Sequence, residues 1–307
     1  MTRVAAIDCG TNSVRLLIAD VDSAGLRDVE RRMEIVRLGE GVDRTGRLSD
    51  EALARTMAAL DTYARRIDES GATAVRMVAT SATRDAANRD EFVTGVRSRL
   101  GVPPEVISGD EEARLSYAGA TYDLPGDVAS PYLVVDIGGG STEFVLGDGV
   151  AGPAAVRSVD VGCVRITERH FSADPPAPAA VAAARADIES ALDAVCASMD
   201  AASAGSVIGL AGSVTTVGGI YLGLPAYDAA AIHHCRVPAD AVRTISDRLL
   251  VAERDERAAI PVMHPGRVDV IAAGALILRC VVDRVGVPEV VVSEHDILDG
   301  IAWSLTT

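Results

Sequence analysis

The sequence contains no lysine, because all 29 of its basic residues are arginine. This absence excludes enzymes that need a phosphate-loop lysine, a Schiff-base lysine or a lysine anchor for pyridoxal phosphate. Aromatic residues make up only 3% of the chain, so its core must consist mainly of aliphatic side chains. Positive charge is also scarce, and the net charge of −15 argues against nucleic acid or an anionic membrane as a partner.

Paired cysteines and long apolar runs are missing too. The five cysteines are scattered without a C-x-x-C spacing, which favours reduced cytosolic thiols over disulfides or a zinc site. The longest strongly apolar run, residues 270–278, is too short to span a bilayer. The N-terminus lacks the basic and apolar regions of a signal peptide, so we expect a cytoplasmic protein.

The length of 307 residues, 49% of them apolar, suits two domains with sizeable cores. Strand-like and helix-like segments alternate, which predicts an α/β layer architecture. A stretch rich in Pro and Gly, residues 124–131, marks the expected boundary between domains at 1–126 and 127–294. The strands are expected near 5–20 (two), 34–38, 75–79, 106–107, 132–147 (two), 155–161, 207–210 and 290–293, and the helices near 49–69, 86–100, 110–121, 177–200, 238–253, 267–285 and 295–305.

An internal repeat opens each half of the chain. Residues 5–20 (AAIDCGTNSVRLLIAD) and 133–148 (LVVDIGGGSTEFVLGD) share an apolar strand, a D-x-G-x-x-S turn, a second apolar strand and a final Asp. Each copy predicts a β-hairpin with a turn rich in glycine and hydroxyl groups.

Such turns can serve as phosphate cradles, because glycine lets backbone N–H groups converge and Ser and Thr add donors. A third loop follows the strand at 207–210 and opens a helix, whose N-terminus suits an anion. A single turn of this kind is as readily structural, but two related turns favour a phosphate cleft between domains. The candidate phosphate-binding residues are Asn12, Ser13, Gly139, Gly140, Ser141, Thr142, Gly212 and Ser213.

Two further segments carry groups suited to phosphate chemistry. In Ser108-Gly-Asp-Glu-Glu-Ala-Arg114, acids favour a first helical turn, yet a carboxylate beside a phosphate could also take a proton from water. Thr80-Ser-Ala-Thr-Arg84 follows a strand, and its Arg could bind phosphate bidentately, cap a helix or pair with Asp85. An Asp at a strand end can hold Mg²⁺.

The segment His233-His-Cys235 contains three metal-ligand types. Adjacent residues usually point to different faces, and the sequence shows no second ligand pair. A surface loop is therefore favoured over a zinc site.

The blocks DCGTNSVRLLI, ATSATRDA, SGDEEARLSY, VVDIGGGSTEFVLG, DVGCVRITE, GLAGSVTTVGG and RVDVIAAGALIL occur in this order. The chain thereby resembles the exopolyphosphatase / guanosine pentaphosphate phosphohydrolase (Ppx/GppA) family, in a short two-domain form. The resemblance implies two actin-like (ASKHA, ribonuclease H-like) α/β domains facing a central cleft. It also implies that the C-terminal helix, within 295–307, packs back on the first domain.

The resemblance implies roles for individual residues. Glu112 would activate the attacking water, and Arg84 would contact phosphate. Asp136 and Glu143 would hold Mg²⁺, with Mn²⁺ as an alternative ion, and Asp8 matches the acid of the first hairpin. Cys9 replaces a common aliphatic residue and is expected to be a small buried hydrophobe.

The implied reaction is removal of the terminal phosphate from inorganic polyphosphate by a cytoplasmic homodimer. Hydrolysis of the alarmone pppGpp to ppGpp, or a non-catalytic sensor of either ligand, are the alternatives. A sugar or acetate kinase is disfavoured, because neither an adenine motif nor the expected base is evident. Longer family members carry an additional helical C-terminal region, so a preference for shorter polyphosphate chains is expected here.

Overall fold

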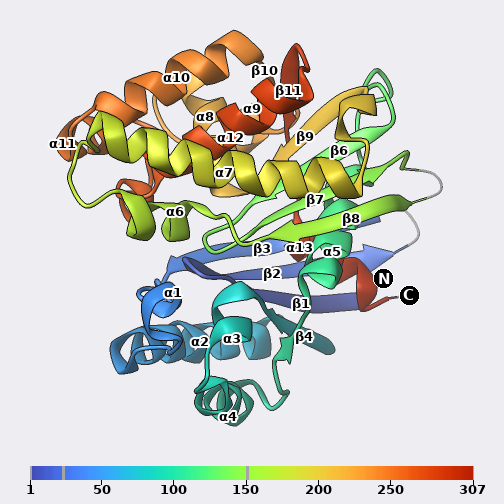
Figure 1. The fold of residues 1–307 in the computed structure, drawn as a ribbon. Coiled ribbons are helices and arrows are strands. Elements are labelled where there is room, and N and C mark those ends of the chain that lie inside the picture. The colour runs from blue at the N-terminus through green and yellow to red at the C-terminus, as the bar shows by residue number, and fades with distance from the viewer. Residues whose placement is uncertain (1, 23–24, 150–151, 307) are drawn as a thin grey trace. The chain divides into compact units, whose positions relative to one another are not determined.

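Each of the two repeats begins a separate mixed β-sheet (Figure 1). The computed structural model describes residues 2–22, 25–149 and 152–306. It divides into unit 1, Met1–Gly119 with Ile297–Thr307, and unit 2, Ala120–Asp296. The division lies at residue 119, a few residues before the stretch rich in Pro and Gly. Residue 307, the end of the expected C-terminal helix, lies outside the described residues.

The sheet of unit 1 has the strand order β3-β2-β1-β4-β5. Its strands are β1 (Thr2–Cys9), β2 (Ser13–Asp22), β3 (Gly25–Ile35), β4 (Ala74–Ala79) and β5 (Glu105–Val106). Its helices are α1 (Val42–Thr45), α2 (Asp50–Ser70), α3 (Ser81–Asp85), α4 (Arg89–Leu100), α5 (Gly109–Thr121), which runs to the start of unit 2, and α13 (Ile297–Ser304). The strands β1 to β3 are antiparallel neighbours, whereas β4 and β5 run parallel to β1.

The sheet of unit 2 has the order β10-β11-β9-β6-β7-β8. Its strands are β6 (Tyr132–Ile137), β7 (Thr142–Gly147), β8 (Pro153–Val159), β9 (Ser206–Leu210), β10 (Arg236–Pro238) and β11 (Glu289–Val292). Its helices are α6 (Cys163–His170), α7 (Pro178–Ser198), α8 (Ala211–Tyr221), α9 (Ala229–Ile232), α10 (Ala239–Val251), α11 (Arg254–Ala258) and α12 (Ile271–Val285), with short 3₁₀ turns η1 (Ala201–Ser203) and η2 (Pro265–Arg267).

The two sheets share one plan, which confirms the internal repeat and the α/β class. In each, three antiparallel strands follow one another, and a later strand lies parallel beside the first. The strand expected at 34–38 is displaced, because β3 runs from Gly25 to Ile35 and includes only residues 34 and 35 of the expected segment. The helix α6 lies between an expected strand and an expected helix and was not itself predicted.

Successive side chains of β1 pack into separate cores on the two faces of the unit 1 sheet. Ala5 and Ile7 pack in the core beneath α2 and α4, whereas Val4 and Ala6 pack against α13. The helix α13 therefore forms part of the core of unit 1. In unit 2 one large core forms around α12, in which all but a few residues are buried.

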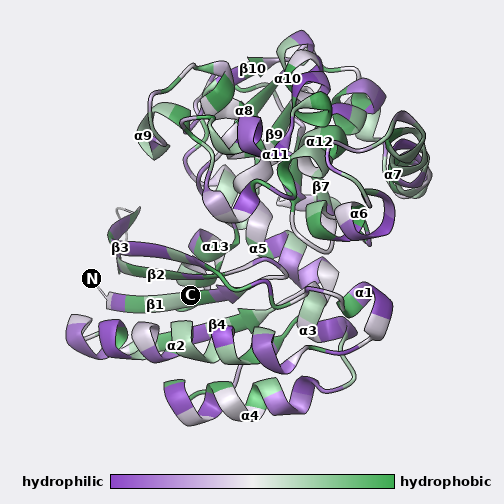
Figure 2. Cartoon of the chain, turned by 90° about the vertical axis from the view of Figure 1, so that its left-hand side faces the viewer, coloured by the Kyte–Doolittle hydropathy of each residue, from purple (hydrophilic) through white to green (hydrophobic). Residues whose placement is uncertain are grey.

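The outer strand β3 is the polar edge of the first sheet. Its sequence, GLRDVERRMEI, alternates little and is charged over most of its length, and Figure 2 colours it largely hydrophilic. A charged edge strand discourages pairing with other chains. Among the described residues, no helix is both long and apolar enough to cross a membrane.

Candidate active site

The predicted motifs of unit 1 lie at the carboxyl ends of neighbouring strands in its sheet. Since β1, β4 and β5 are parallel neighbours, their carboxyl ends lie on the same side of the sheet. The first turn follows β1, Thr80–Arg84 follows β4, and the helix that carries Glu112 follows β5. The hydroxyl oxygens of Thr11 and Ser81, 2.8 Å apart, join the first two segments. Open α/β sheets typically bind ligands at the carboxyl ends of their strands.

Glu112 and Arg84 lie close together at the carboxyl ends of these strands. Glu112 is only 8% exposed. The Nη1 atom of Arg84 lies 3.3 Å from Glu112 Oε2 and donates to the carbonyl of Ile107 at 3.0 Å. The neighbouring Glu111 is instead 47% exposed and pairs with Arg76. The fold thus singles out the second glutamate as the one that is buried and oriented.

The repeat diverges at the residue that faces its aspartate across the hairpin. In β1 and β2, Asp8 faces Arg15, and the two form an ion pair of 2.7 Å. In β6 and β7, Asp136 faces Glu143 instead, and both carboxylates are buried. Ser158 donates to Glu143 Oε1 at 2.8 Å. Like charges directly opposite are unfavourable, and carboxylate oxygens are metal ligands. The second pair is therefore the better candidate for holding a cation, whereas Asp8 is already paired with Arg15.

The two glycine turns close in the same way. The N–H of Gly10 donates to the carbonyl of Ser13 at 2.9 Å, and that of Gly138 to Ser141 at 3.0 Å. This shared hydrogen bond gives the two turns the same local backbone geometry. The sequence correspondence between the repeats extends to a hydrogen bond.

Both turns present backbone donors. Among the described residues, no hydrogen bond uses the N–H groups of Asn12, Gly139 or Gly140. Convergent amides of this kind are what a phosphate oxygen binds. The hydroxyl of Thr142 differs, because it is buried and donates to the carbonyl of Val161 at 2.5 Å. Thr142 is thus better suited to holding the turn than to touching a ligand.

Residues at the start of α6 donate hydrogen bonds to the backbone of the second turn. The carbonyl of Gly139 accepts from the N–H groups of Val164 and Arg165 at 2.9 and 3.1 Å, and the Arg165 side chain donates to the carbonyl of Gly140 at 2.7 Å. A Cβ atom on Gly162 would lie 2.4 Å from the backbone of Gly139. Only glycine allows this contact. The signal for it in the sequence is the block DVGCVRITE.

Replacement of Gly162 by Ala is expected to displace the second turn, because the clash is with backbone that cannot rotate away. We expect a loss of about 1–3 kcal/mol in the free energy of unfolding, together with a large rise in KM for a phosphate substrate. Denaturant unfolding and initial-rate kinetics measure the two effects. Gly126→Ala is the matched control, since its Cβ meets nothing within 4 Å. Equal behaviour of the two variants would contradict this role for Gly162.

An arginine that was not among the predicted site residues, Arg267 of η2, lies against the third loop. Ala211 opens α8 with a positive φ of 63°, a strained conformation typical of functional sites. A Cβ atom on Gly212 would lie 0.9 Å from Arg267 Nη1, so the guanidinium lies directly against this loop. Gly274 likewise makes room for the side chain of Ser213. Gly212, Ser213 and Arg267 together resemble an anion site at a helix N-terminus.

The buried thiols near the turns are not reactive groups. Burial, reinforced by the Asp8 carboxylate, raises the pKa of Cys9 far above its usual value. Burial also raises the pKa of Cys163. A thiol held in its protonated form is a poor nucleophile, which agrees with the expected packing role of Cys9. The five cysteines are all free.

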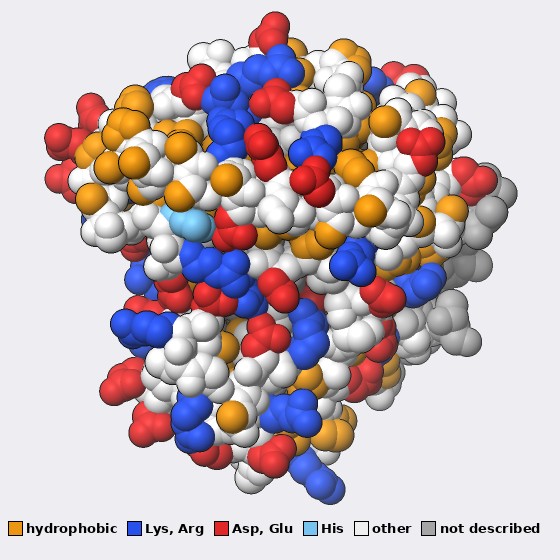
Figure 3. Space-filling model, in the orientation of Figure 1, with side chains coloured by type: hydrophobic (Ala, Val, Ile, Leu, Met, Phe, Trp, Pro, Cys, Tyr) orange, Lys and Arg blue, Asp and Glu red, His pale blue; other side chains and the backbone are white. Residues whose placement is uncertain are grey.

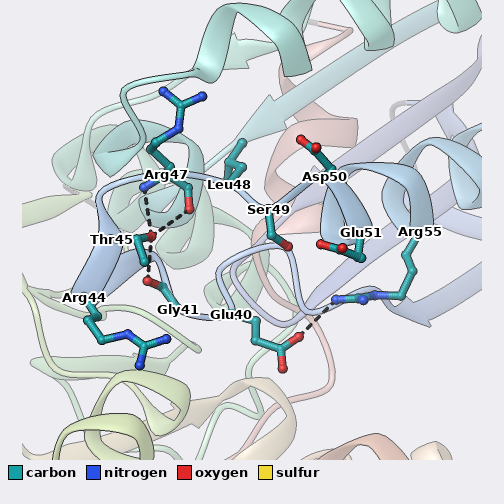
Figure 4. A pocket seen from close by; sticks show the side chains of 10 residues that line it. All are labelled: Glu40, Gly41, Arg44, Thr45, Arg47, Leu48, Ser49, Asp50, Glu51 and Arg55. Carbon is teal, nitrogen blue, oxygen red and sulfur yellow. Dashed lines mark hydrogen bonds and ion pairs between the residues drawn. The ribbon is translucent and has the colours of Figure 1, made fainter.

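A surface hollow of about 720 Å³ lies elsewhere on unit 1 (Figure 4). Three arginines, Arg44, Arg47 and Arg55, line it together with carboxylates, and Arg55 pairs with Glu40 at 3.1 Å. None of the predicted site residues lines this hollow. Figure 3 similarly shows Arg side chains interspersed with Asp and Glu on the face drawn there. The hollow therefore adds no predicted residue to the candidate site.

The comparisons with known proteins agree with this arrangement. A model of the Ppx/GppA phosphatase family matches residues 17–306. Exopolyphosphatase 2 of Mycobacterium tuberculosis is 48% identical over 99% of both chains. A crystal structure of an exopolyphosphatase-like protein matches with a TM-score of 0.95 at 42% identity, covering 98% of both chains. The Aquifex aeolicus Ppx/GppA enzyme matches with a TM-score of 0.82 at 32% identity over 99% of both.

These similarities also confirm the actin-like (ASKHA) architecture for the two sheet-containing units. The family match covers the second repeat in full, residues 17–20 of the first, and all later motifs from Thr80–Arg84 onward. The chain therefore belongs to the Ppx/GppA phosphatase family.

Proposed function

We propose that this chain is an exopolyphosphatase, a phosphoanhydride hydrolase that releases terminal orthophosphate from inorganic polyphosphate in a Mg²⁺-dependent reaction. The observation that carries the proposal is the buried Glu112 held beside Arg84, at the carboxyl ends of the unit 1 strands, where the first glycine turn also presents the unused amide of Asn12. The full-length similarity to a protein named exopolyphosphatase 2 supports the substrate class.

In the proposed reaction, water attacks the terminal phosphorus while Glu112 takes its proton. The bond between that phosphorus and the bridging oxygen breaks, which leaves orthophosphate and a chain shorter by one unit. In unit 1, the amide of Asn12 and the guanidinium of Arg84 would stabilise charge on the transferring group, and in unit 2 the amides of Gly139 and Gly140 are phosphate donors of the same kind. Ser13, Ser141, Gly212 and Ser213 extend these loops with further donors.

Asp136 and Glu143 are the residues that would hold Mg²⁺, because they are two buried carboxylates facing each other across a hairpin. Mg²⁺ prefers oxygen ligands and is usually bound by one or two carboxylates with waters. When bound, the ion would offset charge on the phosphate oxygens. Mn²⁺, with the same ligand preference, remains an alternative, and Asp8 stays a weaker candidate because of Arg15.

The test is phosphate release by the purified chain with short polyphosphate, long polyphosphate, pppGpp and ATP, each with Mg²⁺ and with chelator. We expect release from polyphosphate that requires the metal, with ATP the poorest substrate. Release from pppGpp alone would favour the alarmone hydrolase. Tight binding of polyphosphate without release would favour a sensor. A cytoplasmic location and a homodimer remain predictions, and sedimentation analysis addresses the latter.

A further inference from the structure

Four side chains from three distant segments of unit 2 meet in one cluster. Asp123 follows α5, His233 and His234 follow α9, and His295 follows β11. Asp123 Oδ2 lies 2.9 Å from His295 Nδ1 and 3.1 Å from His233 Nε2. One ligand atom from each of Asp123, His233 and His295 lies within 4.8 Å of the other two. None of these residues belongs to the proposed phosphatase machinery.

The backbone at His234 explains why two adjacent histidines meet in this cluster. His234 has a positive φ of 61°, in the left-handed region that non-glycine residues seldom adopt. As a result the rings of His233 and His234 lie side by side, with centroids 3.6 Å apart. The expectation that they would point to different faces is wrong for this reason. Local strain of this kind is typical of binding and catalytic sites.

Two polar atoms of the cluster lack hydrogen-bond partners. Asp123 Oδ1 and His234 Nε2 are both buried, and neither has such a partner among the described residues. They lie 3.7 Å apart, which is too far for a hydrogen bond. An unsatisfied buried polar atom in a folded protein calls for an explanation, and a bound ion is one.

We propose that Asp123, His233 and His295 form a binding site for a divalent transition-metal ion, with Zn²⁺ as the best fit. Two imidazole nitrogens and one carboxylate oxygen form a donor set that suits Zn²⁺ rather than Mg²⁺. Neighbouring ligand atoms around a tetrahedral Zn²⁺ are about 3.3 Å apart, given metal–ligand bonds of about 2.0 Å. The observed separations of 2.9 and 3.1 Å therefore need little adjustment.

One hydrogen bond must change when the ion binds. At present the N–H of Glu294 donates to His233 Nδ1 at 3.2 Å, so the ring proton sits on Nε2. Metal binding at Nε2 transfers this proton to Nδ1 and gives up that long hydrogen bond. His234 lies beside the three ligands without belonging to their group. Cys235 is not a ligand either, because its sulfur lies near Gly218 on α8.

The position of the ligands suggests a stabilising role. Asp123 lies just after the point where the chain enters unit 2, and His295 just before it leaves. A metal ion on both residues and on His233 would fasten the first and last segments of unit 2 to its interior. Such an ion would act on stability, independently of phosphate hydrolysis.

The experiment measures metal binding directly. Chelator-treated full-length protein is dialysed against Zn²⁺ with Mg²⁺ in large excess, so that all-oxygen sites are saturated, and bound zinc is quantified by elemental analysis. Co²⁺ replaces Zn²⁺ in a second arm, in which a tetrahedral site gives intense visible absorption. We expect one equivalent of zinc, a tetrahedral cobalt spectrum and a higher melting temperature with zinc.

Two variants, Asp123→Asn and His295→Gln, are expected to weaken zinc binding at least tenfold and to abolish the cobalt spectrum. His170→Gln is the matched control, because His170 lies 3.0 Å from Asp187 in the same unit, and Asp187 already has a second partner in Arg169. Melting curves of the metal-free proteins establish that each variant is folded. Less than a tenth of an equivalent of zinc in the parent, or unchanged binding in both folded variants, would overturn the proposal.

Discussion

Replacement of Glu112 by Gln is expected to lower kcat for phosphate release from polyphosphate by ~10²–10⁴-fold, the usual cost of losing a general base. Gln keeps the shape of the side chain and an oxygen that can accept from Arg84, whose Nη1 lies 3.3 Å away. It cannot take a proton from water. KM and the melting temperature should therefore change little, and rapid phosphate-release assays at saturating substrate measure the effect.

Glu111→Gln is the control, because it makes the same chemical change one residue earlier on the same helix. Glu111 is exposed and pairs with Arg76, so its loss should leave kcat within about twofold. A similar loss of activity in both variants would indicate a general effect of charge on the helix. An unchanged kcat in Glu112→Gln would mean that another group activates the water.

Much of this fold could be predicted from the sequence, because its signals are local. The hairpins at 5–20 and 132–147 follow from apolar strands that flank a glycine turn, and they occur where expected. The helix expected near 49–69 likewise occurs as α2, and the Ser49 hydroxyl caps it by accepting from the N–H of Ala52. These features depend on residues a few positions apart, which a sequence displays directly.

Features that depend on distant residues could not be predicted. The contact of Arg267 with Gly212 joins positions far apart in the chain, and neither residue signals the other. The cluster of Asp123, His233 and His295 also combines three segments, and it depends on an unusual backbone angle at His234. Sequence reasoning could rank such residues by chemistry, but only the fold brings them together.

Replacement of Glu143 by Gln is expected to separate stability from activity. Without metal, the variant should be more stable than the parent by about 0.2–1 kcal/mol, because it removes a buried carboxylate that faces Asp136. The Ser158 hydroxyl can still donate to the Gln oxygen. With Mg²⁺, the parent should gain stability and the variant should not, while kcat falls on the order of 10²–10³-fold.

Arg15 occupies the position of Glu143 in the first repeat, and its replacement is expected to change stability in the opposite direction. Arg15 faces Asp8 where Glu143 faces Asp136, so Arg15→Gln leaves a buried carboxylate without its ion pair. We expect this variant to lose at least about 1 kcal/mol in the free energy of unfolding, with or without Mg²⁺. Denaturant unfolding of both variants, with metal and with chelator, makes the comparison. If Glu143→Gln lost stability without metal as Arg15→Gln does, the buried carboxylate pair would be stabilised by the protein itself, and the case for a cation at Asp136 and Glu143 would fail.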